Sequence, residues 1–321
     1  METTEAARAC RATLRANSRC RARMSLSRVT SRESTVHCKR ELAAAASPLR
    51  GWVGMLRRLS VLVLTAASAC APEPASSVEL RQTIADVVDL GRALAIEQTV
   101  VELGTDLDPG LTPAQLAMEV LAALAESTPC ASLERFGASG IHVEFGAPDS
   151  ACSEAEPRLA GALRIVFSAP DPDERLATLT HIDLERAGAT LTGTTQVTWG
   201  MKDARRVVSE LRLEDADARQ VEIQADRIQR EYEGALQLDG FQQWQTLMGR
   251  WELEIGGWEL EHGALVPRVG VASIDTPYEH DIFLDFTGAV PEGLGVRANG
   301  GRRDHVFAVD PLGKVVDLGE G

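Results

Sequence analysis

Apolar residues recur at helical spacing in two segments before residue 130. In the first segment they form one stripe, made of Leu80, Ile84, Val87, Gly91, Leu94 and Val101. The second segment opens at Thr112, which is placed as an N-cap, with Pro113 at the first helical position and Gln115 completing a capping box. Pro129 ends it. We therefore expect two or three amphipathic helices over residues 79–129, each of which needs a surface to pack on.

Beyond residue 130 the spacing changes to two, which is typical of strands with one buried face. Segments of this kind, separated by turns rich in glycine and aspartate, are 140–146, 163–167, 176–185, 191–199, 207–213, 221–225, 228–238, 244–248 and 282–286. Short connections favour pairing between successive strands. The sequence therefore predicts a mainly β (α+β) fold, in which residues 130–321 form a curved antiparallel β-meander.

A direct repeat stands out within residues 251–262, where Trp-Glu-Leu-Glu-Ile and Trp-Glu-Leu-Glu-His flank Gly256 and Gly257. The large apolar residues are odd-numbered in the first half and even-numbered in the second, so a straight strand would place them on opposite faces. A two-residue Gly-Gly turn removes this conflict and predicts a hairpin. One face of the hairpin would then carry four opposed carboxylates, those of Glu252, Glu254, Glu259 and Glu261.

These four carboxylates need compensation, because like charges directly opposite each other cost roughly 0.2–1 kcal/mol per pair. Water on an open face, neighbouring arginines such as Arg230 or Arg250, and a bound cation are the three alternatives. Calcium is the cation whose preference for oxygen ligands fits glutamates, although a flat sheet presents them at awkward angles. Calcium is thus the one candidate cofactor that the sequence offers.

An export signal precedes the predicted fold. Residues 55–69 carry two arginines near their start, Arg57 and Arg58, continue with an apolar run too short to span a bilayer, and end in small residues before Cys70. The segment Ala67-Ser68-Ala69-Cys70 resembles the lipobox of bacterial lipoproteins, and the resemblance covers residues 55–70 only. It implies cleavage before Cys70 and attachment of diacylglycerol to the cysteine sulfur. Plain secretion after the same cleavage is the alternative.

The residues on either side of this signal differ in character. Residues 70–78 are rich in proline and serine and predict a tether that lifts a folded domain off a membrane. Because Ala71 rather than aspartate follows the cysteine, the resemblance implies an outer-membrane lipoprotein in the periplasmic or the surface leaflet. Residues 1–54 are basic and lack a helical or strand period, so we expect a disordered extension. A start codon assigned too far upstream, a transit peptide and a basic arm for nucleic acid are its three explanations.

The charge balance changes once the signal is removed. Of the 33 basic and 47 acidic residues, 13 and 4 precede Cys70, which leaves a net charge of −23 over 252 residues. Such a chain is expected to repel nucleic acid and anionic lipids, and it favours solubility and basic or cationic partners. The expected membrane contact is therefore the lipid anchor at Cys70.

Cysteine usage agrees with export. Cys130 and Cys152 are the two cysteines that follow Cys70, and in an oxidising compartment an even pair predicts a disulfide. Two buried thiols are the alternative. A metal site is less favoured, because neither cysteine has a histidine or a third cysteine at ligand spacing.

Signatures of known catalytic motifs are missing from the sequence, including the Gly-x-Ser-x-Gly elbow, the zinc motif His-Glu-x-x-His and the phosphate-binding loop. Two weaker groups remain. His181, Asp183 and Glu185 would share one face of a strand, and His280 with Asp281 forms a second polar group. Either would act as a site only with partners that the sequence does not place.

Three classes of function follow from these patterns. The first is a lipid-anchored cell-envelope protein with a non-enzymatic role in binding or scaffolding, whose partner is an unknown protein. The second is a periplasmic carrier of apolar ligands, for which an aromatic content of 4% is low. The third is an exported hydrolase built on His181 or His280. We expect the first, with no enzymatic activity.

Overall fold

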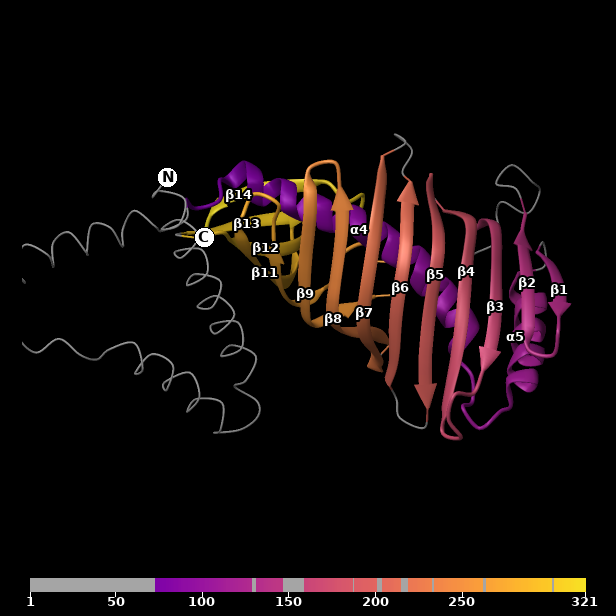
Figure 1. Ribbon diagram of the computed structural model, residues 1–321. Helices are drawn as coiled ribbons and strands as arrows, with labels where there is room; N and C mark the ends of the chain where they lie inside the picture. Colours follow the sequence, from indigo (N-terminus) through magenta and orange to yellow (C-terminus); the bar gives the residue numbers. More distant parts are fainter. Residues whose placement is uncertain are drawn as a thin grey trace, which may run out of the picture. The chain divides into compact units, whose positions relative to one another are not determined.

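One antiparallel sheet of 14 strands dominates the part of the chain that the computed structural model describes, which is residues 73–128, 131–146, 159–186, 188–200, 204–214, 219–232, 234–261, 264–301 and 303–321 (Figure 1). Two helices precede the sheet, α4 (Ser77–Thr105) and α5 (Pro113–Ser127). The strands are β1 (Ser132–Phe136), β2 (Gly140–Phe145), β3 (Ala160–Ser168), β4 (Glu174–Arg186), β5 (Ala189–Gly200), β6 (Ala204–Glu214), β7 (Gln220–Tyr232), β8 (Ala235–Thr246), β9 (Gly249–Leu260), β10 (Val269–Asp275), β11 (Asp281–Val290), β12 (Gly293–Asn299), β13 (Asp304–Val309) and β14 (Val315–Glu320). The predicted mainly β, antiparallel fold is confirmed.

Sequence order and spatial order coincide in this sheet. Each strand pairs with the next, from β1 at one edge to β14 at the other, and the sheet stays open. Because every pair is antiparallel, successive connections alternate between the two rims of the sheet. Strands and helices belong to one compact unit that extends from Pro74 to Gly321. Cys70, Cys130 and Cys152 lie outside the described residues, so the predictions of lipidation and of a disulfide remain predictions.

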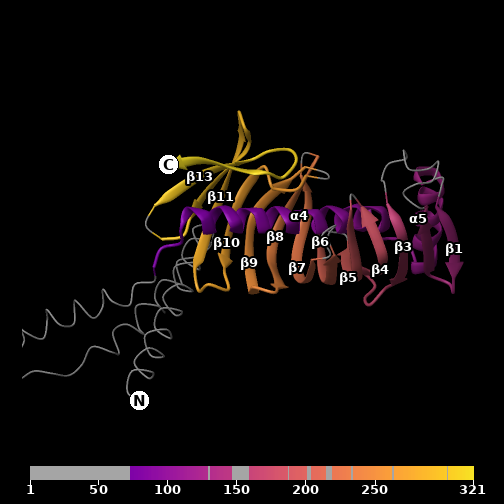
Figure 2. The ribbon, with the colours of Figure 1, turned by 90° about the horizontal axis from the view of Figure 1, so that it is seen from above.

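Helix α4 forms the centre of this unit. It crosses the inner face of the sheet, and the C-terminal strands β11 to β13 lie on the other side of it (Figure 2). The helix contacts β4 and β5 as well as β13 and β14, which are far apart in the sheet. A sheet that bends around a helix can bury that helix on most of its sides.

The burial of α4 differs from the predicted single stripe. Leu80, Ile84 and Val101 on the predicted stripe are buried, but Val88, Ala95 and many other residues outside it are buried as well. An amphipathic pattern expects one packed face and one wet face. Here the sheet supplies partners on several sides, so small and polar residues of α4 are enclosed along with the large apolar ones.

The helix termini follow the sequence signals closely. Ser76 caps α4 by accepting a hydrogen bond from the Glu79 amide. The capping box predicted for the second helix is present in α5, between Thr112 and Gln115. Helix α5 packs on β1, β2 and β3 through buried residues that include Leu116, Val120 and Leu124. These caps satisfy amide groups that a helix terminus would otherwise leave unpaired.

Two strand boundaries were placed wrongly. The predicted strands 221–225 and 228–238 divide differently, because β7 runs without a break through residue 232 and β8 begins at Ala235. The predicted strand 244–248 is the end of β8 followed by a turn at Leu247 and Met248. The pair of charged residues at 226–227 led to the prediction of a turn there. Strand β7 in fact continues through both, and the Arg227 side chain is buried in the interior.

The predicted hairpin at Gly256 and Gly257 is wrong. Strand β9 continues through both glycines, and a β-bulge there sets two residues of β9 opposite Asp239 of β8. Gly257 adopts a φ of 59°, and its amide donates to the Asp239 carboxylate at 2.8 Å. The extra residue moves the alternation by one position, so that Trp251 and Trp258 both face the core. Either a bulge or a hairpin would bring the apolar residues before and after the two glycines to the same face, and the structure contains the bulge.

A second bulge separates His181 from the residues grouped with it. The pairing of β4 with β5 shifts between His181 and Leu184, where Asp183 has a φ of 47°. His181 faces the interior, Asp183 faces solvent, and Glu185 is only partly buried. The prediction that these three side chains share one face is therefore wrong, because the inserted residue reverses the alternation beyond it.

Candidate functional site

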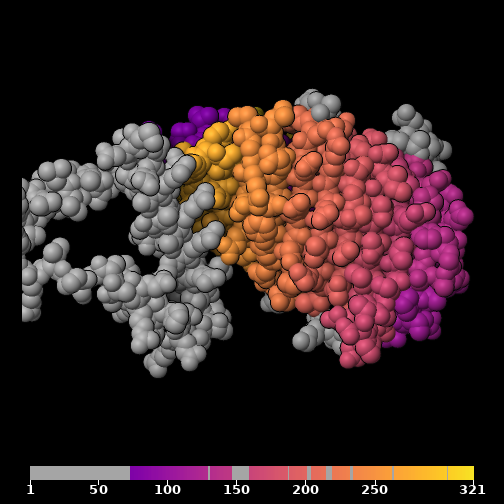
Figure 3. All heavy atoms as spheres, in the orientation of Figure 1, coloured from indigo at the N-terminus to yellow at the C-terminus, as the bar shows by residue number. Residues whose placement is uncertain are grey.

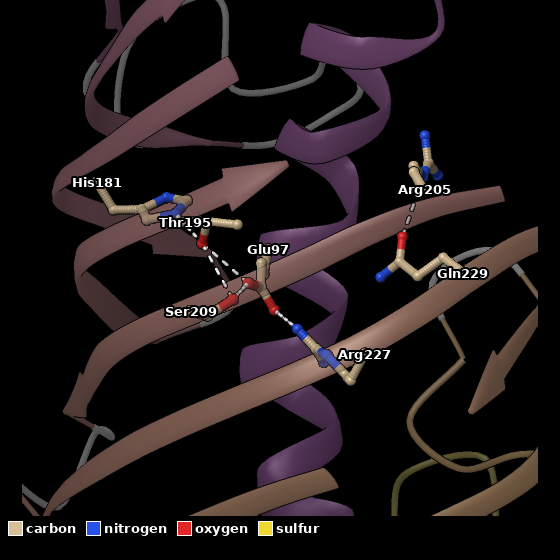
Figure 4. A network of polar contacts seen from close by, with 7 residues as sticks. All are labelled: Glu97, His181, Thr195, Arg205, Ser209, Arg227 and Gln229. Atoms are coloured by element: carbon tan, nitrogen blue, oxygen red, sulfur yellow. Dashed lines mark hydrogen bonds and ion pairs between the residues drawn. The ribbon is translucent and has the colours of Figure 1, made fainter. Parts of the chain in front are cut away.

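A buried polar cluster joins α4 to the inner face of the sheet (Figure 4). Its centre is Glu97 of α4, and the sheet contributes His181 of β4, Thr195 of β5, Ser209 of β6 and Arg227 of β7. The side chains of Arg227 and Glu97 are only 1% and 3% exposed. We call these five residues the Glu97 cluster. The four residues from the sheet lie in a row across β4 to β7, because each occupies an inward-facing position of its strand.

The hydrogen bonds of the cluster converge on the carboxylate of Glu97. Ser209 and Thr195 each donate a hydroxyl hydrogen to it, Thr195 over 2.9 Å, and Arg227 donates from its guanidinium. Since the Thr195 hydrogen is used in this way, the 3.0 Å contact between His181 and Thr195 needs an N–H on Nε2 of His181 as donor. In the neutral imidazole, this contact places the proton on Nε2 and leaves Nδ1 unprotonated.

Electrostatics favours the ionised form of Glu97. Burial alone would raise the pKa of this carboxyl, but the charge of Arg227 and the hydrogen bonds from Ser209 and Arg227 outweigh it, and the pKa is lowered. A buried ion pair of this kind is strongly destabilised when one partner is removed, because the remaining charge has no compensation. The two charges therefore depend on each other for their place in the core.

His181 is shifted towards its neutral form. Burial lowers its pKa below the ordinary value, and the nearby charge of Glu97 opposes that shift only in part. A neutral imidazole agrees with the hydrogen-bond pattern, in which Nε2 donates to Thr195. The cluster at neutral pH thus contains one carboxylate, one guanidinium and a neutral histidine.

A second polar contact lies farther along the same helix. Arg205 of β6 donates to Gln229 of β7 at 3.0 Å and to Thr105, the last residue of α4, at 3.2 Å (Figure 4). Burial lowers the pKa of Arg205, and the acidic residues Glu102 and Asp106 partly offset that effect. Together with the Glu97 cluster, this contact holds α4 against β6 and β7 at two points.

The chemistry open to the Glu97 cluster is limited by the directions of its hydrogen bonds. A serine nucleophile needs a base that accepts its proton and a histidine that a carboxylate orients. Here Ser209 donates straight to Glu97, and His181 reaches Glu97 only through Thr195. All five side chains are buried between helix and sheet. The arrangement is therefore suited to a structural role, in which the hydrogen bonds and the ion pair fix the position of α4 on the sheet.

Three of the four predicted carboxylates, those of Glu252, Glu254 and Glu259, lie along the continuous strand β9, and Glu261 follows its end, so the four do not face one another across a hairpin. Glu252 pairs with Arg250 at 2.9 Å, and Glu259 pairs with Arg268 at 2.8 Å. Glu254 lines an open hollow of about 420 Å³ with Asp226, Gly240, Phe241 and Ile255. Arginine neighbours thus compensate two of the four carboxylates. Within the described residues, no group of three or more acidic, histidine or cysteine side chains is placed to hold a metal ion.

The second histidine group forms a different contact. His280 interacts through Nδ1 with the carboxylate of Glu79 in the first turn of α4, while Asp281 is exposed at the start of β11. The contact ties the β10–β11 turn to the beginning of the helix. It does not bring His280 together with Asp281 or with His181.

The centre of the cluster escaped prediction, although the sequence holds a signal for it. Glu97 falls in an apolar stretch of α4, and Arg227 occupies an inward position of β7 between Ala225 and Gln229. A charge at a position that the period assigns to the core is a candidate for a buried partner. The separation of 130 residues between the two charges hides the pairing until the fold is known.

Comparison with known proteins adds no family to this description. No protein-family model, curated protein or solved structure matches the chain. Neither α4 nor α5 has the length and apolarity that crossing a bilayer requires.

Proposed function

We propose that this protein is a lipid-anchored protein of the bacterial cell envelope with a non-enzymatic role in binding or scaffolding. The observation that carries the proposal is the short stretch between the lipobox-like cysteine and the folded unit, which begins at Pro74, four residues after Cys70. An extended chain spans about 3.5 Å per residue, so a lipid on Cys70 would hold Pro74 within about 14 Å of the point of attachment. The proposed place is the outer membrane, in its periplasmic or surface leaflet.

Burial of the Glu97 cluster supports a role other than catalysis. Catalysis needs a substrate within reach of the reacting groups. Ser209 and His181, the nucleophile and base types in the cluster, are each 2% exposed and lie beneath α4. The burial of His181 therefore gives no support to a hydrolase built on it, and His280 is engaged in its contact with Glu79.

The packed interior argues against a carrier of apolar ligands. A carrier needs apolar side chains around an unfilled space. Helix α4 occupies the inner side of the sheet, and large residues on both sides of the contact, such as Ile84, Leu179 and Leu284, are fully buried. A ligand would have to displace the helix and the ion pair that fastens it.

The outer face of the sheet is the surface that we propose for binding (Figure 3). It extends over many strands and is mainly polar, with exposed apolar side chains such as Val166, Ile182 and Phe241 among the polar ones. Strands β4 and β5 present threonines there at alternate positions, namely Thr178, Thr180, Thr190, Thr192, Thr194 and Thr198. Hydroxyl and charged groups on a broad sheet suit a protein partner. Nucleic acid is disfavoured by the net charge of residues 70–321.

The proposal is tested by following the full chain and its Cys70→Ser variant in a Gram-negative host. We expect the unaltered chain in the membrane fraction, released by detergent but not by salt, and the variant in the soluble periplasmic fraction. A photo-cross-linking amino acid at exposed Thr194 should capture a protein partner on the outer face. Recovery of the unaltered chain in the soluble fraction would overturn the anchor, and a Thr194 probe that captures no envelope protein would argue against the scaffolding role.

A further inference from the structure

Two large apolar side chains project into solvent from the turn between β8 and β9. Leu247 is 104% exposed and Met248 is 65% exposed. The turn is ordered, because the Met248 amide donates to the Thr246 hydroxyl at 3.1 Å and Gly249 adopts a φ of 134°. Turns are usually polar, since water is their only neighbour. An ordered turn that exposes two large apolar side chains to water is suited to contact with an apolar surface outside the molecule.

This turn lies beside the next turn on the same rim of the sheet. A Cβ placed on Gly249 would lie 2.5 Å from the Cβ of Pro277, in the turn between β10 and β11. The indole of Trp251 meets the ring of Tyr278 edge-on, with centroids 6.2 Å apart. The β8–β9 and β10–β11 turns therefore form one continuous surface.

The start of the folded unit is tied to that surface. Glu79, in the first turn of α4, contacts His280 after the β10–β11 turn. The Ala75 amide donates to the Gly300 carbonyl at 2.8 Å, which fixes the chain before α4 to the β12–β13 turn. We call residues 74–79, 246–249, 276–280 and 300–301 the anchor rim; its β8–β9 turn is at the upper end of these two strands in Figure 1.

Two more side chains add apolar or interfacial character to the anchor rim. Val78 of α4 and Tyr278 are both exposed. Tyrosine is enriched at membrane–water interfaces, because its ring is apolar and its hydroxyl is polar. Leucine, methionine, valine and tyrosine thus stand on the rim from which the chain leaves towards Cys70.

We propose that the anchor rim is a second membrane contact, in which Leu247 and Met248 enter the interfacial layer of the bilayer that carries the lipid anchor. The inference rests on the proposed function. Cys70 is four residues from Pro74, so the anchor point lies within about 14 Å of this rim. An anchor that short brings the rim to the bilayer surface and leaves the outer face of the sheet free for a partner.

Charge identifies the type of lipid surface. The anchor rim contains the carboxylates of Glu79 and Glu279, Asp281 is exposed beside it, and the whole unit is acidic. An acidic protein is repelled by anionic headgroups and tolerated by zwitterionic ones. The partner surface is therefore a zwitterionic bilayer, such as phosphatidylcholine or phosphatidylethanolamine.

The opposite rim offers a matched control. Leu312, in the turn between β13 and β14, is 84% exposed. Connections of an antiparallel meander alternate between rims, and the β13–β14 turn falls on the rim opposite the β8–β9 turn. A probe at Leu312 therefore reports on another highly exposed apolar position, which the proposal keeps away from lipid.

The experiment places an environment-sensitive fluorescent amino acid at position 247 or 312 of the full chain, purified with its own modification from a Gram-negative host. Each protein is reconstituted into phosphatidylcholine vesicles, with or without nitroxide lipid as a depth-dependent quencher. We expect a blue shift and strong quenching at position 247, and neither change at position 312. The pair Leu247→Glu with Met248→Glu should abolish protection of the anchor rim from a soluble protease, and Leu312→Glu should leave it unchanged.

The possible results separate the two proposals. Sedimentation with vesicles but equal fluorescence at positions 247 and 312 would overturn the second contact and leave the anchor intact. Failure to sediment would overturn both. Quenching at position 247 in a chain that also carries Cys70→Ser would support the contact and show that it does not depend on the lipid.

Discussion

Glu97 is the residue on which the contact between helix and sheet depends most. Its carboxylate receives hydrogen bonds from three strands, and its charge is compensated by Arg227 alone among the described side chains of the cluster. An ion pair in the core gives little net stability compared with apolar residues of the same size. What it provides is a defined position, because α4 reaches both Arg227 and the two hydroxyls in one orientation only.

Removal of one charge of this pair should be costly. Glu97→Gln keeps the shape of the side chain but leaves Arg227 buried without a counter-ion, so we expect a loss of about 3–5 kcal/mol in the free energy of unfolding. Urea denaturation followed by circular dichroism measures it. The matched control is Asp226→Asn, which breaks the exposed pair with Arg206 at 2.6 Å and should cost at most about 1 kcal/mol. Equal losses in the two variants would contradict the role of Glu97.

His181 should make stability depend on pH. Its pKa is lowered in the folded state, so the unfolded chain binds the proton more readily, and the free energy of unfolding falls as pH drops below about 6.5. The lowered pKa of Glu97 acts in the same direction at more acidic pH. In His181→Gln the decline between pH 7.5 and about 5.5 should be smaller than in the unaltered chain. The same decline in both proteins would show that other groups cause it.

At the scale of elements, bulges account for the largest errors of prediction. The alternation of apolar and polar residues predicted within residues 251–261 is present in the structure, and it shifts by one position at the two glycines. Sequence alone does not distinguish a hairpin from a bulge there, because both place the large apolar residues of the two halves on one face. They differ in pairing: in a hairpin the two halves pair with each other, whereas with a bulge both halves pair with neighbouring strands. By contrast, the capping box at Thr112 was predicted correctly, since it depends on neighbours within one turn.

Deletion of Gly257 tests the bulge directly. Without the extra residue, Trp258 and Leu260 would turn towards solvent, so we expect the variant to lose its cooperative unfolding transition. Gly257→Ala is the control: the position has a φ of 59° and open space around a Cβ, so the substitution should cost about 1 kcal/mol, from backbone strain alone. Tryptophan fluorescence during urea unfolding measures the unfolding transition of both variants. A deletion variant as stable as Gly257→Ala would rule out the bulge.

Two glycines of α4 should respond to alanine in opposite ways. A Cβ at Gly91 would lie 1.8 Å from the Leu265 carbonyl oxygen, whereas a Cβ at Gly104 would find ordinary contacts at 3.6 Å. Alanine favours a helix over glycine by about 1 kcal/mol. Gly104→Ala should therefore raise the midpoint of thermal unfolding and Gly91→Ala should lower it. An increase for both would show that the loop around Leu265 does not pack closely on the helix.

At the scale of the whole molecule, the sequence predicted the class of fold but not its closure around a helix. Local alternation and short turns are enough to predict an antiparallel meander. The enclosure of α4 depends on β4 and β14, which are far apart in sequence, facing the same helix. The stripe of Leu80, Ile84 and Val101 was visible, whereas the burial of Ala95 and Glu97 on other sides was not. Small and charged residues in a helix predict an exposed face, and only the positions of the opposing strands reveal that these residues are buried.

The enclosed helix bears on the functional hypotheses. A sheet curved around an empty interior would favour a carrier of apolar ligands, whereas here the inner side of the sheet is occupied by α4. In our proposal, the lipid on Cys70 and the apolar turn at Leu247 and Met248 hold the molecule at the membrane, and the outer face of the sheet binds a partner.

We propose a lipid anchor at Cys70 on a domain that carries no ligand. The most direct test is the intact mass of the full chain after expression in a Gram-negative host and gentle extraction in detergent, first native and then denatured. We predict a chain that starts at Cys70 with the added mass of diacylglycerol, and no further mass lost on denaturation. A chain that starts at Cys70 without lipid would contradict the anchor, and an apolar molecule released on denaturation would show that the protein is a carrier.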